Sequence, residues 1–280
     1  MPVKAIALAV IWFLAPFLIP ARVDEGDLRA LLLKNDTVSI EKRLDDLQSR
    51  FERGNLTEFQ LKAAYGPLTH YDEVVATNLA AWVEAAPGSY VAHLAYGTYL
   101  SSVGSAWRGG DYLSKIPKKN LETAVEYWSK AKEELDTSLP LSSRPYLSFY
   151  RLMYLAIYAG APDAARSYLL SANRTLPSNA LARDGYVESL LPKWGGSYDA
   201  VEAFIAESSS EGVPLPILSQ MEAIEEDDIG RSFEDAGDHA TALGHFHRAL
   251  DLAKDAGDDF SYGFLMSSRY HTGLPTRCNC

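Results

Sequence analysis

Apolar residues recur along most of the chain at helical spacing. Ile40, Leu44 and Leu47 lie three or four residues apart, so they share one face of a helix, and Phe51 extends that face by a turn. Strict alternation of apolar and polar residues, which would indicate strands, is almost absent. The pattern therefore predicts an all-α chain with few or no strands.

Proline and glycine divide this pattern into segments of about 14 to 20 residues, a length typical of helical hairpins. The breaks stand at Gly66, Pro87, Gly109, Gly160, Pro177, Gly195 and Gly237. Thr57 followed by Gln60 has the spacing of a capping box, which predicts the start of a helix.

A repeated pattern of small and aromatic residues indicates how the helices are arranged. Gly230 is followed twelve residues later by Ala242, then by Phe246 and Ala249, as in a tetratricopeptide repeat (TPR). Parts of the pattern recur upstream at Ala124, Trp128 and Ala131, at Ala165, Leu169 and Ala172, and incompletely at Ala200 and Phe204, where Glu207 replaces the second small residue. The small residues let two helices approach closely, and the aromatic ring fills the space between them. We expect a TPR-like helical-hairpin solenoid over residues 87–273, with residues 22–86 as an N-terminal helical cap.

Two turns carry a further motif. Between two expected helices stand Trp107, Arg108 and Gly109. A later turn with the sequence LPKWGGS contains Trp194, Gly195 and Gly196. Together with the Ala-rich segment at 124–135, these turns resemble a bacterial TPR-like family classed as a domain of unknown function. The resemblance covers about residues 44–204 and implies the fold and a bacterial origin, but no reaction and no catalytic residue.

The N-terminus carries a targeting pattern. Lys4 precedes an uncharged apolar run over residues 5–21, and the chain turns polar at Arg22. This pattern predicts a secretory signal peptide over residues 1–21, cleaved before Arg22. A retained membrane anchor is the main alternative, since the run is near the lower length limit for a span, and a buried core helix is the third. Both leading interpretations place the rest of the chain outside the cytoplasm, in the periplasm or attached to the envelope.

Composition narrows the possible functions. The chain has 280 residues, of which 47% are hydrophobic and 22% charged, enough apolar mass for a sizeable core. Its net charge of −11 is a poor match for a general nucleic-acid binder, which needs a basic surface. The only two cysteines, Cys278 and Cys280, rule out a disulfide scaffold and lie in a tail, 274–280, that we expect to be disordered. In an oxidising compartment they could pair or bind a soft metal.

No motif for catalysis or for a cofactor is present, and we expect no metal site. His245 and His247 flank the core position Phe246 and, like His239, are expected to be solvated, whereas His70, His93 and His271 have no recognisable partners. The consecutive acids at 225–228 are expected to spread around a solvated helix.

A binding surface is the strongest functional candidate. Four tyrosines recur every four residues and form one stripe on a helix expected at about 146–158: Tyr146, Tyr150, Tyr154 and Tyr158. The repeat register places Asp227, Arg231 and Glu234 on the same concave side. Such a stripe either binds a partner, because tyrosine offers a large contact area with a polar tip, or packs against a neighbouring helix.

These features predict an exported scaffold that binds a protein or peptide without catalysis. One alternative is an envelope enzyme of the helical lytic transglycosylase kind, with Glu84 or Glu188 as its acid. Another is an immunity protein whose acidic charge neutralises a basic toxin.

Overall fold

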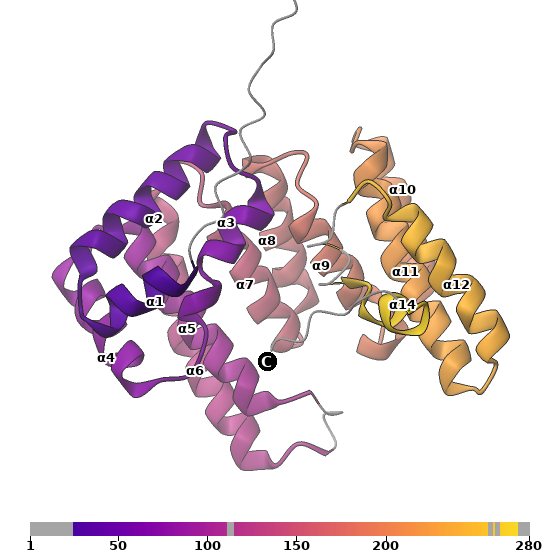
Figure 1. Cartoon of the computed structure of the whole chain (residues 1–280), viewed down its shortest axis with the longest axis horizontal. Helices are drawn as coiled ribbons and strands as arrows, with labels where there is room; N and C mark the ends of the chain where they lie inside the picture. Colours follow the sequence, from indigo (N-terminus) through magenta and orange to yellow (C-terminus); the bar gives the residue numbers. More distant parts are fainter. Residues whose placement is uncertain (1–24, 111–114, 257–259, 261–263, 274–280) are drawn as a thin grey trace, which may run out of the picture.

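The protein is all-α, as predicted, and the described residues contain no strand (Figure 1). The computed structural model describes residues 25–110, 115–256, 260 and 264–273. Within these ranges it contains 13 α-helices. They are α1 (Glu25–Leu33), α2 (Thr37–Glu52), α3 (Glu58–Ala64), α4 (Glu73–Ala85), α5 (Tyr90–Arg108), α6 (Lys118–Ser138), α7 (Tyr146–Tyr158), α8 (Pro162–Thr175), α9 (Leu181–Leu190), α10 (Tyr198–Ser210), α11 (Leu215–Asp235), α12 (His239–Leu252) and α14 (Met266–His271). Three 3₁₀ turns join them: η1 (Gly66–Leu68), η3 (Leu139–Leu141) and η4 (Pro192–Trp194).

Short polar side chains begin several of these helices. Their oxygens accept backbone N–H groups of the first turn, which have no partner within the helix. The capping residues are Asp36, Thr57, Asp72, Ser89, Ser197 and Asp238. Thr57 and Gln60 form both hydrogen bonds of the predicted capping box.

Consecutive helices pack lengthwise as α5 with α6, α7 with α8 and α11 with α12. In Figure 1, α1–α6 occupy the left and lower part of the molecule, α7–α9 the middle, and α10–α12 with α14 the right. The positions of the repeat pattern form the buried faces of α6, α8 and α12. In α10 the pattern is weaker: Ala200 is only half-buried and Glu207 is exposed. The incomplete copy in the sequence therefore corresponds to a less buried helix.

Glycines mark the closest approaches within two of these pairs. A Cβ on Gly104 would lie 2.5 Å from the Trp128 ring, and one on Gly230 would lie 2.5 Å from the Phe246 ring. Gly230 thus lies between the two helices of one pair, as expected of a small residue in this pattern, and it faces the Phe246 ring. Only glycine leaves room for an aromatic ring at these places.

The N-terminal helices share one hydrophobic core with the rest, and this core extends from Leu28 to Leu265. The expected boundary at 86–87 falls in the turn between α4 and α5. Glu58 of α3 reaches the start of α9, where its carboxylate accepts the Ala180 N–H at 2.6 Å and the Tyr146 hydroxyl. Since α9 has no side-chain cap of its own, Glu58 supplies one from 122 residues away.

Two predictions concern segments outside the described residues. The apolar run at 5–21, with its cleavage point before Arg22, is one, and the tail at 274–280, with Cys278 and Cys280, is the other. Among the helices that the structure describes, none combines the length and apolar character needed to cross a membrane.

Candidate functional site

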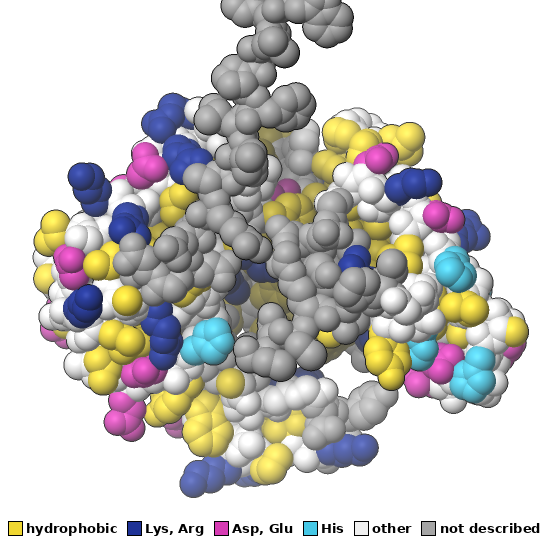
Figure 2. Space-filling model, viewed as in Figure 1, with side chains coloured by type: hydrophobic (Ala, Val, Ile, Leu, Met, Phe, Trp, Pro, Cys, Tyr) yellow, Lys and Arg dark blue, Asp and Glu magenta, His cyan; other side chains and the backbone are white. Residues whose placement is uncertain are grey.

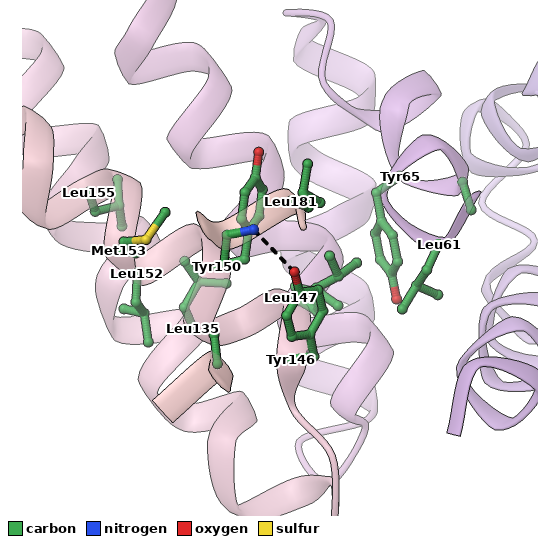
Figure 3. Close-up of a cluster of buried hydrophobic side chains, with 14 of the residues drawn as sticks. Leu61, Tyr65, Leu135, Tyr146, Leu147, Tyr150, Leu152, Met153, Leu155 and Leu181 are labelled. Atoms are coloured by element: carbon green, nitrogen blue, oxygen red, sulfur yellow. Dashed lines mark hydrogen bonds between the residues drawn. The ribbon is translucent and has the colours of Figure 1, made fainter. Parts of the chain in front are cut away.

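The first half of the tyrosine stripe belongs to the core. Tyr146 is fully buried and Tyr150 is only 3% exposed, surrounded by leucines of α6, α7 and α9 (Figure 3). The Ala182 N–H of α9 donates to the Tyr146 hydroxyl at 3.3 Å, and the Lys62 ammonium of α3 lies 5.9 Å from the Tyr150 ring centre. The expectation that Tyr150 is exposed on a concave face is therefore wrong, because α3 and α9 cover this end of α7.

The second half of the stripe approaches the surface. Tyr154 and Tyr158 are half-buried, and the rings of Tyr150, Tyr154 and Tyr158 follow one another at 5.1 and 6.0 Å. Gly185 of α9 makes room for this ladder, because a Cβ there would lie 2.4 Å from the Tyr154 hydroxyl. Burial raises the pKa of both outer tyrosines, so their hydroxyls stay protonated at neutral pH.

The two motif turns of the sequence meet at the outer end of this ladder. Tyr158 stacks on Trp128 of α6 at 5.3 Å, and its other neighbour is the Trp194 ring of η4 at 6.5 Å. The Arg108 guanidinium, at the end of α5, lies 5.7 Å from the Trp194 ring centre. We call this group (Arg108, Trp128, Tyr158 and Trp194) the aromatic–arginine surface. The sequence marked both turns, but their distance along the chain hid the fact that they are neighbours.

Two glycines fix the Trp194 turn. Gly195 ends η4 with φ of 89°, a left-handed conformation that glycine adopts without strain. A Cβ on Gly196 would lie 1.9 Å from the Leu190 carbonyl oxygen, so only glycine fits there. The turn holds Trp194 with 43% of its surface exposed, and Trp107 beside Arg108 is 42% exposed. A large aromatic side chain is thus exposed to solvent at each of the two turns. At the other turn, Gly109 ends α5 at φ of 69°.

Charged groups surround the aromatic–arginine surface. Lys193 lies 3.7 Å from Glu188 and 3.4 Å from Asp228, which ties the turn to α9 and to α11. Arg151 lies over the Tyr150 ring at 5.7 Å. Both signs of charge are present, so the surface can offer ion pairs beside its rings.

The acidic run at 225–228 is not the solvated face we expected. Glu226, Asp227 and Asp228 are buried, and Asp227 is only 2% exposed. The backbone N–H and the hydroxyl of Ser268 in α14 donate to Asp227 at 2.7 and 2.6 Å. Burial raises the pKa of Asp227 despite these hydrogen bonds. The expected role of Asp227 in an open groove is therefore wrong, because α14 covers it.

The other residues expected on the concave side pair within the C-terminal helices. Arg231 binds Asp228 at 2.8 Å and approaches Asp227 at 3.5 Å. Glu234 lies 2.8 Å from the His239 ring and 3.8 Å from the His271 ring. Acidic and histidine side chains gather over α12 and α14 in Figure 2.

Besides His239 and His271, two more histidines that we expected to be solvated or unpartnered have defined partners. His93 is buried, with Nδ1 2.7 Å from Glu134 and Nε2 3.1 Å from the Pro87 carbonyl oxygen. His245 contacts Glu226 at 2.7 Å and stacks on Phe233. Their partners come from other helices, so sequence spacing could not reveal them.

The residues considered for catalysis do not converge. Glu84 is exposed, and Glu188 pairs with Lys193. Burial raises the pKa of Glu58, but its carboxylate is used as the cap of α9. Among the described residues, no group of three or more His, Cys, Asp or Glu side chains is arranged to hold a metal ion.

Comparison with known proteins adds no family: no family model, no curated protein and no solved structure matches the chain.

Proposed function

We propose that this chain is an exported TPR-like scaffold that binds a protein or peptide through the aromatic–arginine surface. The observation that carries the proposal is the convergence of Arg108, Tyr158 and Trp194 from three separate parts of the chain, with Trp107, the residue before Arg108, also exposed. Tryptophan, tyrosine and arginine are the residues most enriched in the energetic centres of protein interfaces. The solenoid arrangement is supported by the lengthwise helix pairs and by the buried repeat positions.

The contacts of the Trp194 turn support the same role. The Lys193 ion pairs join the turn to α9 and α11, and the Tyr158 ring and the Arg108 guanidinium lie against the Trp194 ring. A side chain that is already held in place loses little conformational entropy when a partner covers it.

Site-directed photocrosslinking tests the proposal. A photoreactive phenylalanine at position 194 should capture one dominant species from an envelope fraction. The same group at position 71 should not, because Tyr71 is also exposed but makes no described contact with the residues of the aromatic–arginine surface. Trp194→Ala should weaken binding of the captured species by about 2 kcal/mol or more, which is about thirtyfold in affinity. Equal capture from both positions, or unchanged affinity of the variant, would contradict the proposal.

The identity of the captured species separates the scaffold role from the neutralisation of a toxin, which requires a basic toxin as the partner. The enzyme alternative requires activity that depends on Glu84 or Glu188.

The export prediction has its own test. N-terminal sequencing of the protein from its native host should give a chain that begins at or near Arg22. An intact Met1 in the membrane fraction would select the retained anchor. An intact Met1 on a soluble cytoplasmic protein would refute export.

A further inference from the structure

A second surface feature lies between α8, α9 and α10, and none of its lining residues belongs to the aromatic–arginine surface. It is a shallow, open groove of about 420 Å³. Its floor is apolar and includes Leu190, Ala200, Ala203 and Phe204. Asp163 and Glu207 stand on its rim.

The groove exists because α10 packs loosely on its partner. The contact between α9 and α10 is far smaller than that between α5 and α6. The glycine of α9, Gly185, faces Tyr154 of α7 and not α10. Glu207 occupies the position where the other second helices carry a small buried residue. The helix α10 therefore remains apart from α9 near Glu207.

The groove already holds one cation on aromatic rings. The Arg166 guanidinium lies 5.6 Å from the Tyr186 ring centre and 5.3 Å from that of Phe204, and it pairs with Glu207. The two rings meet edge to face at 5.0 Å. Rings placed in this way attract cations through their electron-rich faces.

The rim has more negative than positive charge. Glu207 is shared with Arg166, while Asp163 is exposed and forms no ion pair with any residue that the structure describes. Two carboxylates thus face one guanidinium, in a protein whose net charge is −11. A basic partner is the complementary one, and an acidic partner would be repelled.

We infer that this groove binds an amphipathic segment of a partner protein. An aliphatic side chain of that segment fills the floor beside Leu190, Ala200 and Ala203, and a neighbouring lysine or arginine pairs with Asp163 and Glu207. The inference does not depend on the aromatic–arginine surface, so either site can fail without the other.

Fluorescence anisotropy with two labelled peptides tests this inference. The first is a twelve-residue peptide in which leucine and lysine alternate, and the second replaces each lysine by glutamate. The purified chain that begins at Arg22 should bind the lysine peptide and not the glutamate peptide. Ala203→Trp fills the groove and should weaken binding by about tenfold or more.

The matched control is Ala206→Trp, an exposed alanine on the same helix that does not line the groove. It should bind as the original chain does, which separates the groove from general attraction between a basic peptide and an acidic protein. Asp163→Lys, at an exposed position, should weaken binding without affecting packing. The inference is overturned if the lysine peptide does not bind, if both tryptophan variants lose affinity equally, or if the glutamate peptide binds as tightly.

Discussion

In the helix pairs α11–α12 and α9–α10, an aromatic residue of the second helix packs against the first helix, but the two pairs are packed differently. In α11–α12, Gly230 leaves space for the Phe246 ring, which is fully buried between the helices. In α9–α10, the glycine faces the preceding pair, and Phe204 borders an open groove. Both pairs use an aromatic residue four positions after an alanine. The placement of one glycine and one small residue therefore decides whether the pair closes.

The difference shows where this architecture can carry a surface for partners. Phe246 is buried against the other helix of its pair, whereas Phe204, although also buried, lies beneath a groove and is covered in part by the Arg166 guanidinium. The place where the repeat pattern of the sequence is incomplete, at Glu207, is also the place where the structure opens.

The largest expected effect is a loss of stability, and it should differ between alanine variants of Phe246 and Phe204. Phe246→Ala removes a fully buried ring and should lower the free energy of unfolding by about 3–5 kcal/mol. Phe204 is also buried, but it borders the groove, so Phe204→Ala leaves a space that opens to solvent instead of a closed cavity and should cost at least about 1 kcal/mol less. Urea denaturation of both variants measures the difference, and equal losses would mean that the two pairs are packed alike.

The next effect concerns the glycine contact. Gly230→Leu places a side chain where the Phe246 ring lies and should cost about 1–3 kcal/mol, lowering the melting temperature. Gly244→Leu on α12 is the control, since the space around Gly244 is open and leucine favours helix. The control should be as stable as the original chain or more stable. If Gly230→Leu melts at the original temperature, the two helices are not as close as described.

The smallest expected effect is a pH dependence of stability, caused by Glu225 of α11 beside Glu202 of α10. Burial raises the pKa of Glu225 from 4.5 to about 7, with further contributions from Glu202, Glu226 and Glu222. The folded chain therefore binds more protons than the unfolded chain between these pH values, so stability falls as the pH rises from about 4.5 to about 7. Glu225→Gln keeps the uncharged state and should flatten this dependence. Melting curves across that pH range test it, and parallel slopes for the two proteins would rule out Glu225 as the source.

Local sequence signals predicted the local structure well. The helix expected at about 146–158 is α7, the capping box at Thr57 is present, and the small and aromatic repeat positions are buried. These features depend on residues within one or two helical turns, where spacing fixes geometry.

The candidate site depended on contacts that spacing cannot reveal. The burial of Tyr150 comes from α3 and α9, and that of Asp227 comes from Ser268, 41 residues away. The approach of Arg108 to Trp194 likewise joins two turns 86 residues apart. A periodic pattern gives the buried face of one helix, but it does not tell which distant segment covers the rest.

The Glu58 cap of α9 has a consequence for the order of folding. Until α3 docks, the first amides of α9 lack the carboxylate that satisfies them, so the middle of the chain is completed only after the N-terminal helices are in place. Synthesis from the N-terminus supplies these helices first. The cap also makes the Ala180 amide a reporter, because its hydrogen exchanges with solvent only when α3 detaches. The exchange rate at this one amide therefore reports how often α3 separates from the start of α9.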